Sequence, residues 1–249
     1  MLMTMRAYTE GCRAMAITSA AAFDASHHHP DAEVRKQNQA FYEFMVPLIK
    51  GYSTEMSVEV ASLGVQVHGG MGFIEETGAA QYLRDARILP IYEGTTAIQA
   101  NDLVGRKTAR DGGRTPKAIA ARMAVTEGEL AQRDSAAARS MLKRLRAARA
   151  AFEQVVDFVA GNATPNAKYA GSVPYLMLAG NLVSGWQMAR ALVVAEDQLA
   201  KGEGDAAFLK AKVATAHFYA EHLLTKAPGL RDSIVDGADS VTALALDSF

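Results

Sequence analysis

The sequence predicts an all-α protein, and three observations support this fold class. Apolar residues recur every three or four positions through almost every long segment. No segment shows the alternation of apolar and polar residues that is typical of a half-buried strand. Glycines and prolines gather between the long segments, where they would end helices. With 249 residues, of which 49% are hydrophobic, the chain is long enough for one or two domains with real cores.

The first helix is expected over residues 1–23, which are rich in alanine and methionine. Its apolar stripe consists of Met5, Tyr8, Cys12, Met15 and Ser19. The HHHPD stretch that follows should end this helix and place His27–His29 in a loop. No other cluster of ligand-like residues lies nearby, so we interpret these histidines as solvated rather than metal-binding.

A longer helical segment is expected over residues 32–67, where large apolar residues again form a stripe. Pro47 lies inside this segment and must kink or split it, because proline lacks the N–H that a helical turn needs. Gly69 and Gly70 should stop the helix. After them we expect a short helix over residues 77–87, an extended stretch over 88–92 and a helix over 96–107.

Residues 110–116 form a polar, glycine-containing segment, which we take as the boundary between two helical units. It divides the chain into a unit of residues 1–109 and a second unit of residues 110–249. Ser135 is a suitable N-cap in the second unit. Four helices are expected there, over about 117–132, 135–160, 171–201 and 205–226, with turns at 162–166 and 201–205.

Composition argues against several classes of protein. The formal net charge of −1 gives no reason to expect a nucleic-acid partner. Cys12 is the only cysteine, so no intrachain disulfide can form and a reducing compartment is expected. Polar residues interrupt every apolar stretch before it reaches membrane-spanning length, and we find no secretory signal. We therefore expect a cytoplasmic protein without a membrane span.

Glu93 is the candidate catalytic residue. It follows an apolar approach, Ile88-Leu89-Pro90-Ile91-Tyr92, and a carboxylate in such surroundings tends to be desolvated, which makes it a stronger base. Gly94 leaves room for a ligand or another backbone. Thr96 to Gln99 matches a capping box, so a helix should begin just after Glu93, and its N-terminal field would favour the ionised carboxylate. These features alone favour the plainer interpretation, in which Glu93 is a surface turn residue and Thr96 only a cap.

Three short motifs in register decide between these alternatives. They are Gln-x-x-Gly-Gly-x-Gly-Phe at 66–73, Tyr-Leu-Arg-Asp-Ala-Arg-Ile at 82–88 and Ile-Tyr-Glu-Gly-Thr at 91–95. Their order and spacing closely resemble the signature of the acyl-CoA dehydrogenase family. The resemblance is strongest over residues 35–107 and moderate elsewhere.

The resemblance implies an FAD-dependent oxidation of an acyl-CoA to a trans-2-enoyl-CoA. Glu93 would be the catalytic base, and Thr95 would touch FAD in its own subunit. Gln66, Gly69 and Gly70 would contact the adenosine and pyrophosphate end of FAD held by a neighbouring subunit. Ala97 replaces a polar residue that often helps to bind flavin in the family, which puts that contact in doubt. Electrons would pass to electron-transfer flavoprotein or a similar acceptor.

The resemblance also refines the expected fold. Residues 1–109 resemble the family's C-terminal four-helix bundle without its first helix, so we expect an incomplete bundle with an exposed apolar stripe. Residues 110–249 resemble the extra helical bundle of larger bacterial members, a branch that includes the methylmercaptopropionyl-CoA dehydrogenases. The chain would then be truncated, part of a split gene, or a subunit completed by another chain or by a homo-oligomer. Two other functions stay open: a non-catalytic helical assembly subunit, and an acyl-CoA oxidase that passes electrons to oxygen.

Overall fold

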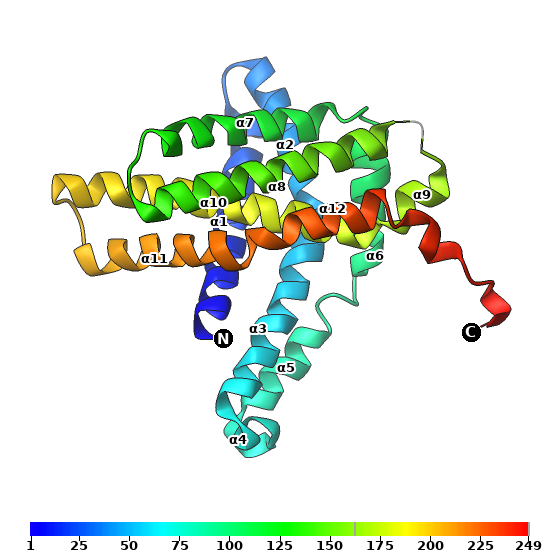
Figure 1. The fold of residues 1–249 in the computed structure, drawn as a ribbon, viewed down its shortest axis with the longest axis horizontal. Coiled ribbons are helices and arrows are strands. Elements are labelled where there is room, and N and C mark those ends of the chain that lie inside the picture. The colour runs from blue at the N-terminus through cyan, green and yellow to red at the C-terminus, as the bar shows by residue number, and fades with distance from the viewer. Residues whose placement is uncertain (162, 249) are drawn as a thin grey trace.

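The computed structural model describes residues 1–161 and 163–248, and all regular elements in these ranges are helices (Figure 1). This confirms the all-α fold class. The first six α-helices are α1 (Leu2–His28), α2 (Ala32–Pro47), α3 (Ser53–His68), α4 (Gly70–Phe73), α5 (Ala79–Arg87) and α6 (Thr96–Val104). The next six are α7 (Arg114–Ala131), α8 (Ala136–Ala160), α9 (Pro165–Ala170), α10 (Ser172–Lys201), α11 (Ala206–His222) and α12 (Ala227–Val235). None of these helices is long and apolar enough to cross a membrane.

Breakers and caps act largely where the sequence predicts them. Pro47 ends α2, and a π-helical turn, Leu48–Tyr52, joins it to α3. Gly69 follows α3 with φ of +62°, a conformation that glycine adopts without steric cost. Ser135 caps α8, since its hydroxyl accepts a hydrogen bond from the amide of Ala138 at 2.9 Å. The local rules therefore place most helix ends correctly.

Other boundaries differ from the prediction. Helix α1 continues to His28 instead of ending at Phe23, and the ring of His27 packs on Phe23 with centroids 4.3 Å apart. The helix expected over 205–226 ends at His222, and α12 then begins with a proline in its first turn. Helix α9, which begins at Pro165, takes up the last two residues of the turn expected at 162–166, of which Asn162 lies outside the described residues.

The stretch 88–92 is not extended, so that prediction was wrong. The amide of Leu89 bonds the carbonyl of Ala86 at 3.1 Å, and the amide of Tyr92 bonds the carbonyl of Ile88 at 3.2 Å. These bonds continue α5 into a series of turns. Consecutive turns do not alternate side chains between two faces as a strand does, and this changes the surroundings of Glu93.

Helix α10 lies at the centre of the molecule, against α1 and α6 from the first unit and α8, α11 and α12 from the second. Tyr175 and Trp186 on this helix are buried in the core. Gly180 lets α10 approach the first unit closely, because a Cβ there would lie 2.2 Å from Cγ of Tyr52. Residues 1–109 and 110–249 thus share one continuous core.

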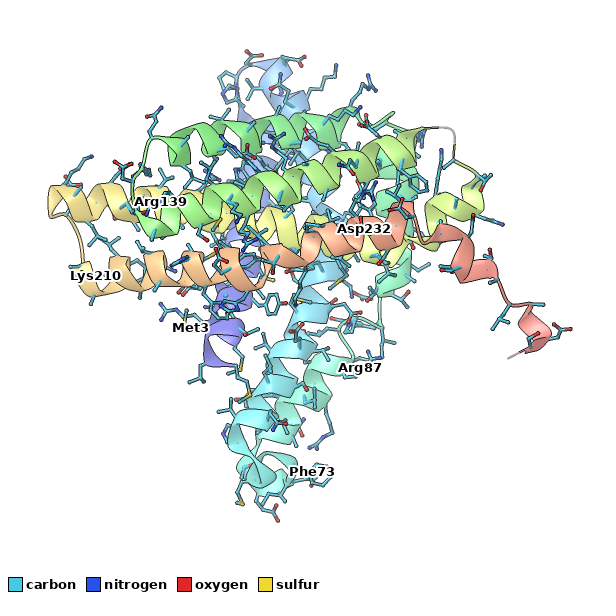
Figure 2. The ribbon with its side chains drawn as sticks, in the orientation of Figure 1. Met3, Phe73, Arg87, Arg139, Lys210 and Asp232 are labelled. Carbon is cyan, nitrogen blue, oxygen red and sulfur yellow. The ribbon has the colours of Figure 1, made fainter. Side chains whose placement is uncertain are left out.

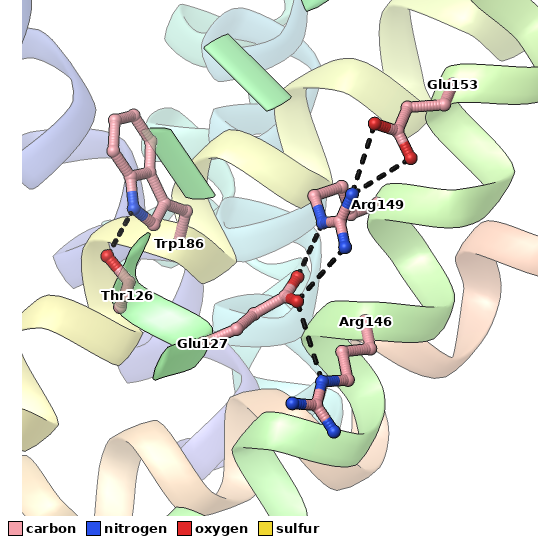
Figure 3. A network of polar contacts seen from close by, with 6 residues as sticks. All are labelled: Thr126, Glu127, Arg146, Arg149, Glu153 and Trp186. Atoms are coloured by element: carbon pink, nitrogen blue, oxygen red, sulfur yellow. Dashed lines mark hydrogen bonds and ion pairs between the residues drawn. The ribbon is translucent and has the colours of Figure 1, made fainter. Parts of the chain in front are cut away.

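An ion-pair network centred on one buried carboxylate fastens α7 to α8 near this core (Figure 3). Glu127 is 4% exposed and accepts two hydrogen bonds from Arg149, at 2.6 and 3.1 Å. Arg149 also bonds both carboxylate oxygens of Glu153. The bond to Glu127 raises the pKa of the Arg149 guanidinium. Beside this network, the indole N–H of Trp186 donates to the hydroxyl of Thr126 at 2.9 Å.

Helices α3, α4 and α5 form an arm that projects from the body (Figure 1). The short α4 makes its tip, where Phe73 points outward (Figure 2) and is 82% exposed. Tyr82 on α5 is 75% exposed. Large exposed apolar side chains on a projecting element are typical of a surface that binds a ligand or another polypeptide.

Candidate functional site

The turn between α5 and α6 carries Glu93 in a strained backbone conformation. Glu93 has φ of +49°, and among the described residues it is the only non-glycine residue with positive φ. Gly94 follows with φ of +95°. The left-handed region is unfavourable for a residue with a Cβ, and such strain persists only where the surrounding structure enforces it. Residues in strained conformations cluster at functional sites, which marks Glu93 independently of any motif.

Glu93 is exposed in this chain, so the expected desolvation of its carboxylate is wrong for the chain by itself. The apolar residues of its approach do not cover it. Ile88, Ile91 and Tyr92 are 51%, 48% and 46% exposed. The reason is the series of turns at 88–92, which directs these side chains outward. Glu93 therefore lies on an apolar surface that is open to solvent.

The helix after Glu93 is capped by Thr95 and not by Thr96, so the predicted capping box is shifted by one residue. The hydroxyl of Thr95 accepts a hydrogen bond from the amide of Ile98 at 3.3 Å. With Thr95 as the cap, the residue that would complete the capping box is Ile98 and not Gln99. The backbone amide of Gln99 donates to the carbonyl of Thr95 instead. The Gln99 side chain lies close to Gly94, where a Cβ would be 2.9 Å from its Nε2 atom.

Two residues that sequence reasoning missed hold the Glu93 turn from below. Lys50, in the π-helical turn, donates to the carbonyl of Leu89 at 2.5 Å, and its Nζ lies 4.9 Å from the centroid of the Tyr92 ring. Glu55, in α3, accepts a hydrogen bond from the hydroxyl of Thr96 at 2.5 Å. Both lie some forty positions before the turn, and no local pattern connects them to it.

Gln66, Gly69 and Gly70 lie together at the tip of the arm and are exposed. Nothing lies within 4 Å of the place where a Cβ on either glycine would be, so the backbone there is open to a close approach. These residues and the Glu93–Thr95 pair stand at opposite ends of α5, which is about 13 Å long at 1.5 Å per residue. The structure thus brings the candidate residues together in two separate groups.

A largely apolar groove of about 580 Å³ lies between α1, α3 and α5. Tyr8, Cys12, Met56 and Val60 are among the residues that line it. Burial raises the pKa of the Cys12 thiol to about 11. Burial also raises the pKa of the Tyr8 phenol, whose oxygen accepts a hydrogen bond from Lys226 at 2.9 Å.

Two models of known protein families match this chain. The model described as "Acyl-CoA dehydrogenase, C-terminal domain" matches residues 1–107. The model described as "Acetyl-CoA dehydrogenase C-terminal like" matches residues 117–245, more than half of the chain. The chain belongs to the acyl-CoA dehydrogenase family.

Individual relatives agree with this assignment. The chain is 55% identical to 3-methylmercaptopropionyl-CoA dehydrogenase of Ruegeria pomeroyi, in a match that covers 99% of this chain and 42% of the relative. It is 34% identical to a broad-specificity linear acyl-CoA dehydrogenase of Mycobacterium tuberculosis, over 94% of this chain and 40% of the relative. The chain therefore spans about two fifths of the length of these relatives.

A solved structure supports the fold. An acyl-CoA dehydrogenase from Bacillus anthracis, complexed with FAD, superposes with a TM-score of 0.69 and 18% sequence identity. The match covers 98% of this chain and 45% of that structure. Both helical units of this chain consequently have counterparts in one known arrangement.

Proposed function

We propose that this chain supplies the catalytic base and part of the flavin-binding surface of an FAD-dependent acyl-CoA dehydrogenase. The observation that carries the proposal is the Glu93 turn, where a carboxylate stands on an open apolar surface in a strained conformation, directly before the N-terminus of α6. A scaffold has no need to hold a glutamate in the left-handed region, and this argues against a purely structural subunit.

The residues present fit FAD on features of this structure. Thr95 uses its oxygen as an acceptor for the amide of Ile98, so its O–H remains available as a donor. The two glycines at the tip offer exposed backbone with open space above it. Gln66 beside them is exposed, and its amide can both donate and accept. By the resemblance to the family motifs, the two groups would contact two different flavins, one in this subunit and one in a neighbour.

The chemistry follows from the acidity of the substrate. The proton on the carbon next to a thioester carbonyl is weakly acidic, so its removal needs a well-positioned base, and the departure of a hydride from the next carbon makes that removal productive. Glu93 accepts the α-proton, the two C–H electron pairs supply the new C=C bond and the hydride, and the product is a trans-2-enoyl-CoA. FAD, when bound, supplies the acceptor for that hydride.

Water must be excluded for Glu93 to act as a strong base. Since Glu93 is exposed in this chain, the cover must come from bound acyl-CoA, from flavin and from further polypeptide. The exposed side chains of Ile88, Ile91 and Tyr92 provide the apolar surface on which such a cover would rest. We therefore expect the chain by itself to bind FAD weakly and to turn over little.

The substrate is an acyl-CoA, and the electron acceptor is electron-transfer flavoprotein or a similar protein. The relative from Ruegeria pomeroyi makes 3-methylmercaptopropionyl-CoA the first substrate to test, followed by linear acyl-CoA thioesters of increasing length.

The test is anaerobic mixing of acyl-CoA with the flavin-loaded enzyme that contains this chain, followed by flavin absorbance. Glu93→Gln keeps the size of the side chain but removes the base. We expect it to slow flavin bleaching by about 10²- to 10⁴-fold while FAD content stays unchanged. Glu129→Gln, an exposed position on α7, is the matched control and should bleach at the wild-type rate. Wild-type bleaching in Glu93→Gln would refute the proposed role and favour a non-catalytic subunit.

A further inference from the structure

We propose that Lys50 and Glu55 are positioning residues that together hold Glu93 in its strained conformation, so that they set the rate of proton abstraction without touching the substrate. This inference rests on the proposed function of Glu93. It concerns two side chains for which the family motifs quoted above give no role, since both lie before the first of those motifs.

The Glu93 turn is a loop that needs an external support. A hydrogen bond from the amide of Thr96 to the carbonyl of Pro90, at 3.1 Å, closes it at its base. Inside this closure, Glu93 and Gly94 both have positive φ, while Ile91, Tyr92 and Glu93 are exposed. The hydrogen bonds of the loop join other residues, and within the described part of the chain Glu93 itself makes none that would oppose its return to an ordinary conformation. The resistance must come from what the loop rests on.

Lys50 supports the first half of the loop. Its ammonium group donates to the carbonyl of Leu89 at 2.5 Å and lies 4.9 Å from the centre of the Tyr92 ring. One cation thus fixes the residue before Pro90 and the residue before Glu93. Charge-assisted hydrogen bonds are the stronger kind, and the ring face adds a cation–π attraction.

Glu55 supports the second half. Its carboxylate accepts from the hydroxyl of Thr96 at 2.5 Å, and Thr96 is the residue whose amide closes the loop. Lys50 and Glu55 have opposite charges and lie five positions apart, yet they form no ion pair with each other, and neither forms one with any other residue that the structure describes. Each charge is instead directed across to the loop.

The backbone beneath the loop explains how both side chains reach it. The π-helical turn Leu48–Tyr52 carries Lys50, and such a turn changes the direction of side chains relative to a continuous α-helix. Gly51, next to Lys50 in this turn, allows α6 and α10 to pack closely, since a Cβ there would lie 3.1 Å from Cβ of Gln99 on α6 and 2.6 Å from Leu176 on α10. The support of Glu93 therefore reaches from α6 through the π-helical turn into the core.

The experiment measures loop closure and catalysis separately in the flavin-loaded enzyme. Hydrogen–deuterium exchange of the peptide covering residues 88–99 reports the closure without any turnover. Lys50→Met removes the donor and the charge, and Glu55→Leu removes the acceptor. We expect each to accelerate exchange in this peptide by about tenfold or more, and to lower kcat by about 10- to 100-fold with KM for acyl-CoA changed less than about threefold.

Conservative variants provide the rescue that a purely structural role would not predict. Lys50→Arg keeps a cationic donor, and Glu55→Gln keeps an oxygen that can accept from Thr96, so both should stay close to wild type in exchange and in kcat. Thr96→Val removes the hydroxyl on the loop side and should reproduce Glu55→Leu, which covers the case in which a variant on α3 fails to fold. Lys36→Met, at an exposed position on α2, is the control for loss of a lysine.

The outcomes separate this inference from the proposed function. Unchanged exchange at 88–99 in Lys50→Met and in Glu55→Leu overturns the inference, whatever Glu93 does. Faster exchange with unchanged kcat, in an enzyme that Glu93→Gln inactivates, overturns it as well. If Glu93→Gln itself remains active, the proposed function fails, and the exchange data still decide whether the two charges hold the loop.

Discussion

Glu127 and Glu93 are two carboxylates of one chain in opposite surroundings. Glu127 lies between α7 and α8, is 4% exposed and is paired with Arg149 in an unstrained helix (Figure 3). Glu93 is exposed and has positive φ, and it appears in none of the ion pairs within residues 1–161 and 163–248. Buried charges are paired because an isolated one would be costly. The contrast teaches that the buried, paired carboxylate of Glu127 stabilises the helical core, while the exposed carboxylate of Glu93, held in a strained backbone conformation, is the candidate catalytic group.

The largest effect on stability should come from Glu127. Glu127→Ala leaves Arg149 with Glu153 alone and removes the link between α7 and α8. We expect a loss of about 3 kcal/mol in the free energy of unfolding, since Glu127 is the buried partner of both Arg149 and Arg146 and its removal breaks the inner part of the network. Urea unfolding measures it. Asp236→Ala, which breaks an exposed pair with Arg231, should cost less than about 1 kcal/mol. Equal losses in the two variants would remove the distinction between buried and exposed charges.

The next largest effect should come from the contact between the two units. Gly180→Ala places a methyl group against the ring of Tyr52, which is buried and has little room to move. Overpacking of this kind costs about 1–3 kcal/mol. Gly128→Ala on α7, where nothing lies within 4 Å of the added Cβ, should instead be neutral or slightly stabilising. A neutral Gly180→Ala would show that α10 does not press on Tyr52.

Loss of a helix cap should have a smaller effect. Ser135→Ala removes the acceptor for the amide of Ala138 and also the hydroxyl that donates to Glu196 at 2.5 Å. We expect a loss of about 1 kcal/mol in the free energy of unfolding, measured by the shift of the urea midpoint. Ser135→Asp keeps a capping oxygen but faces Glu196, so it should recover only part of the loss. An unchanged midpoint in Ser135→Ala would mean that water replaces the cap.

The smallest effect, of opposite sign, should come from Glu93. Glycine tolerates positive φ, and relief of roughly 1–2 kcal/mol of strain exceeds the added chain entropy of glycine by a small margin. Glu93→Gly should therefore stabilise the chain by about 0.5 kcal/mol, while it abolishes dehydrogenation. A destabilised Glu93→Gly would show that the glutamate is held by favourable contacts and not against strain.

Local chemistry explains what the sequence could predict. Pro47, Gly69 and Ser135 act through their own backbone and hydroxyl groups, so their effects on helix ends follow from residue type. Thr95 and Thr96 show the limit of such rules, because two adjacent threonines offer the same cap and only the folded turn distinguishes them. The proline in the first turn of α12 is a signal of the same local kind.

The parts that the sequence did not reveal depend on contacts between distant segments. The outward direction of Ile91 and Tyr92 follows from turns whose geometry the motif does not specify. Lys50 and Glu55 reach the loop only because the π-helical turn and α3 pass beneath it. The packing of α10 into the first unit depends on Gly180 meeting Tyr52, more than a hundred residues apart. No periodicity within one helix contains that information.

The central claim is that the Glu93 carboxylate removes a proton from the carbon next to the thioester carbonyl. A 3-thiaacyl-CoA tests it directly, because sulfur at the β position prevents hydride loss and leaves proton exchange as the only reaction. In D₂O, the flavin-loaded enzyme should exchange the α-protons of this thioester, observed by NMR, and Glu93→Gln should slow the exchange to the rate without enzyme. Exchange at the wild-type rate in Glu93→Gln would contradict the account.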